Sequence, residues 1–545
     1  MLITIFLVIL ILLSAQPISL TFQWLIFIMW SGTLVLLVFL LSGYNFSSFK
    51  TNVLKDKYLW IVIIISVLIR LLFIDKYPFI LISDELRDTG ADAWALLNSN
   101  ITNIFGYGMY ASHGLIIPTL ATPFAAIFQE SRYAIVLPAA FFGVIDVFVI
   151  YQLTKKFINK QTALITSLCL SLNPLHLYYS RTQLVVMMSS LLTTIGLYCL
   201  FNFLKNKSWK SFLITAIICG FSFNFHHSIK PVSILISLIV IGYAIRLILQ
   251  KKLKLKFLFI WILIFIVSFG PRLMFTNAYT FFGLSRLPIA NNEIFNIQDY
   301  FNNYLNSLKV IDQQSTVLFF AEHVPLLPFG SVLLMIFGLA IAFLKKTFRS
   351  SFMLILVVLV LTIFFTNSAI TDRINHDHRL APLLPILSLI FGFACYTIWS
   401  FIKKKSHFLA STFLVIVAFV YLAGPLNFFT SGWANRSMHQ SNPEMSYRDF
   451  QIHYSIEAIK NEPFESICIY GSYDFFPMFV MEYYFPKKEI SYQQEETIPE
   501  DTIKFVLDCN TNPSFYSRKQ YCTNSDKLVC PEDGKSFFID YYKHE

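Results

Sequence analysis

Apolar segments of about 20 residues recur along the chain, and they constrain its fold more than any other feature. A helix of that length crosses the roughly 30 Å hydrocarbon core of a bilayer. Helices also satisfy their own backbone polar groups, which lipid cannot do. The chain is only 14% charged, whereas soluble proteins carry about 25% charged residues. The sequence therefore predicts an all-α polytopic membrane protein.

Hydropathy predicts about thirteen membrane-spanning helices. Two of them precede residue 57, because a second apolar stretch follows the first and no basic region marks a signal peptide. Long loops at 75–132 and 276–329 interrupt the series. The predicted spans are 2–13, 22–41, 58–74, 133–152, 161–178, 184–204, 211–226, 230–248, 257–275, 330–344, 351–367, 380–401 and 408–427.

The formal net charge of +10 is distributed as short basic clusters between predicted spans. Cytoplasmic loops of membrane proteins carry such an excess of Lys and Arg, so the clusters indicate topology, not a nucleic-acid surface. With the clusters inside, both long loops and the C-terminus lie on the extracytoplasmic side of a prokaryotic inner membrane. The clusters are Lys50, Lys55 and Lys57; Lys155 and Lys156; Lys205, Lys207 and Lys210; Lys251, Lys252, Lys254 and Lys256; Lys345, Lys346 and Arg349; and Lys403, Lys404 and Lys405.

The C-terminal region differs from the rest in having more charge and short alternating apolar runs. Ser466–Gly471 and Ile503–Cys509 are predicted strands, and Phe475–Tyr484 is helix-like. These elements predict a small α/β extracytoplasmic domain. The expected organisation is two N-terminal membrane helices and a cytoplasmic loop at 1–57, a transmembrane catalytic module at 58–427, and the soluble domain at 428–545.

An acidic pair, Asp84 and Glu85, lies about ten residues beyond the third span, in the first long loop. Apolar side chains that follow it share one face of a possible interfacial helix. A carboxylate half shielded there has a raised proton affinity and can act as a general base. The alternative is a solvated acid pair at a helix N-terminus, where acids are favoured anyway.

Two charges fall within predicted spans. Arg70 is near the outer third of its span, from where its side chain can snorkel to the interface. Asp146 is deeper and costly unless paired or neutral. Asp146 is the residue that favours a transport path. A transporter or flippase for lipid-linked saccharides, which is the alternative to an enzyme, would use such a charge.

Six segments follow one another along the chain: the acidic pair, His113–Phe128 with Pro118 and Pro123, Ser131-Arg132-Tyr133 through Leu137-Pro138 and Gly143, Asn173-Pro174 through Ser180-Arg181, Lys230-Pro231, and Arg379 with Pro382 and Pro385. In this order they resemble the GT-C glycosyltransferases, specifically the protein O-mannosyltransferase and aminoarabinose-transferase superfamily. The resemblance covers roughly residues 58–427, although the family's Pro-Pro-Leu is absent and the two N-terminal spans are additional.

This resemblance implies transfer of a sugar from a polyprenyl-phosphate donor to an acceptor hydroxyl on the outer face. Asp84, with Glu85 beside it, would accept the hydroxyl proton, and the attack would invert the anomeric carbon. The departing phosphate needs cations, for which Arg181, Lys230 and Arg379 are the candidates. Each can instead snorkel to lipid headgroups. The acceptor can be a protein, a lipid or a glycan.

The mechanism implied by the resemblance requires no cofactor. The further candidate site residues are Asp88, His113, Glu322 and His323. The last three of these, with Glu85, can supply ligands for a divalent cation, but they are scattered in sequence, and no metal site is predicted. His226-His227 offers a similar choice between a cation site and hydrogen-bonded structural histidines.

Two other functions compete with the transferase. A transporter usually has internal inverted repeats, and the sequence has none. A non-catalytic scaffold would tolerate changes in both long loops. Within the enzyme class, an oligosaccharyltransferase ranks below a single-sugar transferase, because its Trp-Trp-Asp signature is absent from residues 428–545.

Overall fold

Apolar helices make up most of the chain in the computed structural model. The residues described are 2–14, 19–42, 55–74, 89–90, 92–98, 104–105, 116–128, 132–182, 184–274, 297–312, 325–344, 348–369, 377–430, 466–471, 489–494, 503–507, 515–521 and 537–543.

Each of the thirteen predicted spans overlaps a helix. The helices that lie in or between the predicted spans are α1 (Leu2–Ser14), α2 (Leu20–Ser42), α4 (Lys57–Leu71), α6 (Asp92–Leu97), α7 (Ile116–Phe128), α8 (Arg132–Phe157), α9 (Lys160–Leu172), α10 (Pro174–Thr182), α11 (Leu184–Asn206), α12 (Trp209–Ser222), α13 (Ile229–Leu249), α14 (Lys256–Ser268), the 3-10 helix η2 (Gly270–Met274), α16 (Ile297–Lys309), α17 (Ser331–Leu344), α18 (Phe348–Phe364), the π-helical turn η5 (Phe365–Ala369), α19 (Asp377–Leu380), α20 (Leu383–Lys403) and α21 (His407–Thr430).

Six of the described helices are long and apolar enough to cross a membrane: α2, α8, α11, α13, α20 and α21. Shorter apolar helices include α1, α12, α14, α17 and α18. The apolar helix α7 lies inside the predicted loop 75–132, where no span was expected. The chain is thus a multi-pass membrane protein, and the count of thirteen spans stays a prediction.

The span predicted at 161–178 consists of two helices. Pro174 has no N–H to continue α9 and is suited to the first position of a new helix. Asn173 caps the new helix, because its Oδ1 accepts the backbone N–H of His176 at 3.0 Å. Its Nδ2 donates to the Leu326 carbonyl at 2.6 Å. This break creates α10, which carries His176 and Arg181.

The N-terminal helices α1 and α2 pack against α12, α14 and η2. The Trp30 indole of α2 donates to the Val267 carbonyl of α14 at 3.1 Å. Its ring occupies the space that a Cβ at Gly270 would need, and Gly270 has a φ of +70°. A side chain at Gly270 would therefore clash and be strained as well. The two N-terminal helices are thus part of the helical core.

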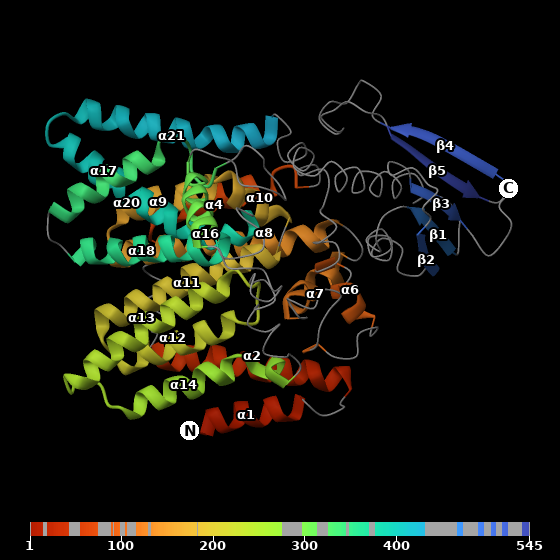
Figure 1. Ribbon diagram of the computed structural model, residues 1–545, viewed down its shortest axis with the longest axis horizontal. Helices are drawn as coiled ribbons and strands as arrows, with labels where there is room; N and C mark the ends of the chain where they lie inside the picture. The colour runs from red at the N-terminus through yellow and green to blue at the C-terminus, as the bar shows by residue number, and fades with distance from the viewer. Residues whose placement is uncertain are drawn as a thin grey trace.

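The C-terminal strands form one mixed sheet in the order β2-β1-β3-β5-β4. In it β1 is parallel to β2, β3 is parallel to β5, and the other two pairs are antiparallel. Both predicted strands are present, as β1 and β3, whereas the expected helix at 475–484 lies outside the described residues. Figure 1 shows the sheet beyond one end of the helices, near α6 and α7. The strands are β1 (Ser466–Gly471), β2 (Glu489–Gln494), β3 (Ile503–Leu507), β4 (Phe515–Tyr521) and β5 (Phe537–Lys543).

A buried carboxylate, Asp56, joins the start of α4 to α8 and α9. Lys155 and Lys160 place their Nζ atoms 2.6 and 3.0 Å from its two oxygens, and the Tyr151 hydroxyl donates to it at 2.9 Å. Burial raises the pKa of this carboxyl, but these three hydrogen bonds outweigh burial and lower the pKa to about 2. The contact joins the segment before α4 to the junction of α8 and α9, where Lys155 belongs to a predicted cytoplasmic cluster.

We expect Asp56→Asn to lower the free energy of unfolding by roughly 1–3 kcal/mol, because the buried Tyr151 hydroxyl and two partly exposed lysines lose a charged acceptor. The folded-state pKa lies below the unfolded value of about 3.9. The carboxylate therefore stabilises the fold above about pH 4, and this stabilisation is lost as the pH falls towards 2. Thermal unfolding of the purified variant at several pH values measures both effects. The exposed Asp299→Asn of α16 is the control, and equal loss in the two variants would contradict the prediction.

Candidate functional site

A basic cluster forms where the start of α13, the turn η5 and α19 meet. We define it as His226, His227, Lys230, His378 and Arg379. The rings of His226 and His227 are 3.9 Å apart, and those of His226 and His378 are 5.5 Å apart. Lys230 follows His227 by three residues and Arg379 follows His378 directly, so the segments that carry two of the three predicted phosphate-binding cations meet here, although they are far apart in sequence.

One amide holds the two halves of this cluster together. Asn367 of η5 donates through Nδ2 to the carbonyls of Ser228 and Arg379, at 3.0 and 3.1 Å. His226 shares a 2.7 Å hydrogen bond with the Ser228 hydroxyl, as expected of a structural histidine. Lys230 and Arg379 are 2% and 3% exposed. Buried cations at such a junction suit an anionic group, because their charge is little screened by water.

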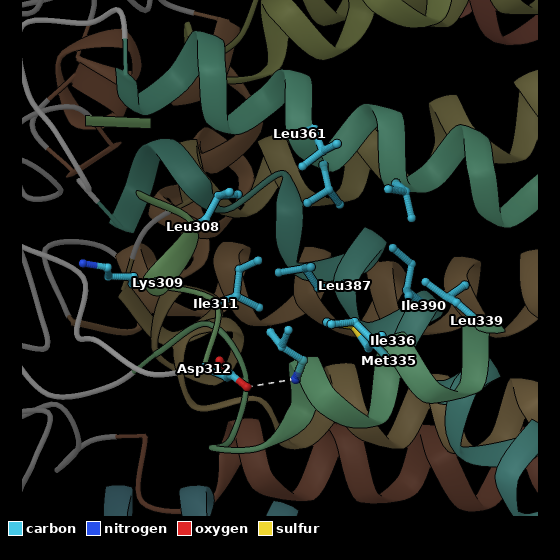
Figure 2. Close-up of a pocket in the computed structure, with 13 residues that line it drawn as sticks. Leu308, Lys309, Ile311, Asp312, Met335, Ile336, Leu339, Leu361, Leu387 and Ile390 are labelled. Atoms are coloured by element: carbon cyan, nitrogen blue, oxygen red, sulfur yellow. Dashed lines mark hydrogen bonds between the residues drawn. The ribbon is translucent and has the colours of Figure 1, made fainter. Parts of the chain in front are cut away.

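An apolar cavity of about 400 Å³ lies among α16, α17, α18 and α20 (Figure 2). Its walls are mostly aliphatic, and the polar residues that line it are Lys309 and Asp312. Asp312 accepts the backbone N–H of Val332 at 2.9 Å, which fixes the start of α17. A cavity with this lining fits a hydrocarbon chain. Its aliphatic lining residues are Leu308, Ile311, Val332, Met335, Ile336, Leu339, Val357, Val360, Leu361, Leu387 and Ile390.

Helix α18 and its continuation η5 connect the cavity to Asn367, which binds the backbone of the basic cluster. Leu361 lines the cavity, and Asn367 follows by six residues, or about 9 Å of helix rise. Helix α16 packs on the same turn, where the rings of Tyr304 and Phe365 are 6.3 Å apart. An apolar cavity thus lies close to a basic cluster, an arrangement that matches an amphiphile with an anionic head.

A second polar group lies deep among α4, α8, α10 and α11. Arg70 donates through a terminal nitrogen to His176 Nδ1 at 2.7 Å, and His176 Nε2 lies 3.2 Å from Asp146. Because arginine is only a donor, Nδ1 must accept and Nε2–H must donate to the carboxylate. Asp146 also accepts from the hydroxyls of Ser190 (2.6 Å) and Thr194 (2.5 Å). We call these five residues the buried ion network.

This network shows how the two charges within predicted spans, Arg70 and Asp146, are accommodated. Arg70 does not snorkel: it is fully buried, and it also donates to the Ser66 hydroxyl at 2.8 Å. The snorkelling that the sequence allowed does not occur, because partners from α10 and within α4 lie beside the guanidinium. Asp146 is likewise fully buried and accepts three hydrogen bonds. The network gives this carboxylate its hydrogen-bond partners, so its burial is explained without a transport path.

Arg181, the third predicted phosphate-binding residue, is fully buried at the end of α10. Its terminal nitrogens donate to four carbonyl oxygens at the end of α4, those of Ile69 (3.0 Å), Arg70 (3.2 Å), Leu72 (2.8 Å) and Phe73 (2.8 Å). The last carbonyls of a helix have no intrahelical partner. Arg181 therefore caps α4, and its predicted contact with phosphate stays a prediction.

The other predicted site residues, Asp84, Glu85, Asp88, His113, Glu322 and His323, lie outside the described residues. Among the residues that are described, no group of three or more His, Cys, Asp or Glu could hold a metal ion. Two further residues of these groups, His176 and Asn367, were not among the predicted site residues. His176 had a signal, because it lies five residues before Arg181 in a segment that Pro174 opens. For Asn367 the only signal was its place in the short polar run Thr366-Asn367-Ser368 at the end of an apolar span.

Asp146→Asn is expected to lower the free energy of unfolding by about 3–5 kcal/mol, because it leaves Arg70 as an uncompensated buried charge. Arg70→Met combined with Asp146→Asn should be less destabilising than the sum of the two single changes. Chemical denaturation in detergent measures the cycle. Additive losses would show that the two charges are not coupled.

Comparison with known proteins gives one family match and a set of similar structures. Residues 112–275, from before α7 to the end of η2, match the family model described as dolichyl-phosphate-mannose-protein mannosyltransferase. This segment contains Asp146, His176, Arg181 and Lys230. No curated protein sequence matches the chain.

The chain is similar in structure to ArnT from Cupriavidus metallidurans, solved bound to undecaprenyl phosphate. The two share 14% identity and a TM-score of 0.55, over 82% of this chain and 87% of ArnT. The archaeal oligosaccharyltransferase AglB from Archaeoglobus fulgidus, solved with an inhibitory peptide and a dolichol-phosphate, has 13% identity and a TM-score of 0.43, over 80% of this chain and 64% of AglB. The likeness to ArnT shows that this multi-pass membrane chain has the GT-C fold.

Proposed function

We propose that this protein is a membrane glycosyltransferase that moves a hexosyl or pentosyl group from a polyprenyl-phosphate donor to an acceptor hydroxyl. The observation that carries the proposal is the basic cluster beside the apolar cavity. The phosphate would bind at Lys230 and Arg379, and part of the isoprenoid chain would lie in the cavity. The family match over 112–275 and the shared fold with ArnT, which binds undecaprenyl phosphate, support the same donor class.

In the proposed reaction the acceptor oxygen attacks the anomeric carbon of the sugar. The bond from that carbon to the phosphate oxygen breaks, and its electron pair stays on the phosphate. The configuration inverts because attack and departure occur on opposite faces. Lys230 and Arg379 would stabilise the charge that accumulates on the leaving phosphate. Arginine offers a fork for two phosphate oxygens and lysine a compact charge.

Asp84 is proposed as the base that takes the acceptor proton, with Glu85 beside it. A carboxylate is suited to this step because the hydroxyl loses its proton only as the new bond forms. No cofactor takes part in this scheme. We place the reaction on the extracytoplasmic face, because the lysine clusters mark the other ends of the spans.

The transport alternative loses its main support. It depended on Asp146 as an unpaired charge within a span, and this carboxylate accepts hydrogen bonds from His176, Ser190 and Thr194. These partners give the carboxylate a structural role in compensating the buried Arg70, which explains its presence without transport.

Lys230→Gln and Arg379→Gln should each weaken binding of undecaprenyl phosphate by about 10-fold or more, because charge-assisted contacts contribute about 1.5–3 kcal/mol. Ile336→Trp should weaken it too, because the added ring enters the cavity. Leu333→Trp is the matched control, on the same helix and exposed but not lining the cavity. Binding by the purified protein measures all four. Equal affinity in every variant would place the lipid elsewhere.

Asp84→Asn should bind the donor with the affinity of the wild type and lose turnover by at least about 100-fold, since a general base contributes roughly 10²–10⁴-fold. Turnover is followed with radiolabelled polyprenyl-phosphate sugars and an acceptor mixture of proteins, lipids and glycans. Normal turnover by this variant would remove Asp84 as the base. Failure of the wild type to bind any such donor would leave only the fold in common with ArnT.

A further inference from the structure

We infer that Arg181 is a positioning residue, which with Arg132 fixes the end of α4 from which the Asp84 segment departs, and is not a ligand of the donor phosphate. The inference rests on the proposed transferase for its catalytic consequence. Its structural basis is an arginine clamp, which we define as Arg181 and Arg132 with the carbonyls that they bind in residues 69–74.

The clamp replaces the backbone partners that α4 lacks at its end. Arg181 binds four carbonyl oxygens there, and Arg132 Nε of α8 donates to the next one, that of Ile74, at 3.1 Å. Unpaired carbonyls are costly inside a membrane protein, where water does not reach them. Two arginines therefore set the path of the chain immediately before residue 75.

The backbone inside the clamp has a conformation that must be held. Phe73 has a φ of +51°, in the left-handed region, although it is not glycine. A bulky residue adopts this region only when its surroundings enforce it. The Arg181 contact to the Phe73 carbonyl, at 2.8 Å, provides that restraint. The direction in which the chain leaves α4 thus depends on the arginine fork.

A second contact joins α4 and α10, and here the arginine belongs to α4 and its partner to α10. Arg70 of α4 binds His176 of α10, while Arg181 of α10 binds carbonyls of α4. At Gly143 of α8, an added Cβ would lie 2.5 Å from Ser180 Cβ and 3.0 Å from Arg70 Nε. Helices α4, α8 and α10 therefore meet with no room for a side chain, and α10 cannot shift relative to α4 without breaking the buried ion network.

The position of the clamp separates Arg181 from the basic cluster. Asn367 links the segments that carry Lys230 and Arg379, because it donates to the carbonyls of Ser228, just before α13, and of Arg379 in α19. Arg181 instead uses both terminal nitrogens on helix carbonyls. A lysine there would keep the charge but has a single nitrogen with no planar fork. Arg181→Lys therefore separates a role in charge from a role in geometry.

The test compares wild type, Arg181→Lys, Arg132→Lys and the exposed control Arg246→Lys, all as full-length protein in detergent. Hydrogen–deuterium exchange is measured for peptides covering residues 66–90, undecaprenyl phosphate affinity by titration, and kcat and KM with donor. For Arg181→Lys we expect exchange in these peptides to rise about 10-fold or more. Affinity and donor KM should stay within about 2-fold, and kcat should fall about 10-fold or more.

Arg132→Lys removes one carbonyl contact and should change exchange and kcat in the same direction by less, so the inference stays testable if Arg181→Lys does not fold. Arg246→Lys should change nothing. Weaker lipid affinity in Arg181→Lys with unchanged exchange would overturn the inference and make Arg181 a phosphate ligand. Unchanged exchange in both clamp variants would overturn it as well. If the wild type neither binds nor turns over a donor, the proposed function fails, while the exchange data still decide whether the clamp holds the end of α4.

Discussion

The hydrogen-bonded chain from Arg70 through His176 to Asp146 is the interaction on which the described helical core depends. A charge within a membrane span is costly unless partners from other helices reach it. Four helices meet this requirement at one point, because α4, α8, α10 and α11 supply Arg70, Asp146, His176, Ser190 and Thr194. The network therefore fixes the relative depth of these helices, which apolar packing alone leaves adjustable.

The buried ion network supports one candidate functional region, the end of α4, more directly than the other, the basic cluster. The end of α4 lies one turn or less beyond Arg70 and is held by α10, which the network fixes. The basic cluster lies on other helices, and Asn367 joins its halves through backbone carbonyls. Helix α18 connects the cluster to the cavity through Leu361. The molecule thus has one rigid support near α4 and a separate site with a polar and an apolar part.

The sequence predicted the helical class, and each predicted span overlaps a helix, because lipid imposes a long apolar helix wherever the chain crosses. It also predicted strands β1 and β3. It missed β2 and β4, whose polar sequences form strands through pairing across the sheet, and it also missed the aromatic-rich β5. It did not predict the break at Asn173, although Pro174 is a local signal. For Arg70 it allowed snorkelling, because the rule considers one helix in lipid and cannot include His176 from another.

The three cations predicted to bind phosphate show where sequence reasoning about a site ends. Arg181, Lys230 and Arg379 were selected by one criterion, a positive charge at a predicted helix end. In the structure, Lys230 and Arg379 come together in one cluster, whereas Arg181 meets the carbonyls of α4. The difference depends on whether the last turn of a neighbouring helix lies within reach of the guanidinium. A helix end presents free carbonyls to a fork of N–H donors as readily as a phosphate presents oxygens. An arginine at a helix end therefore acquires its role from the neighbouring helix, which only the fold reveals.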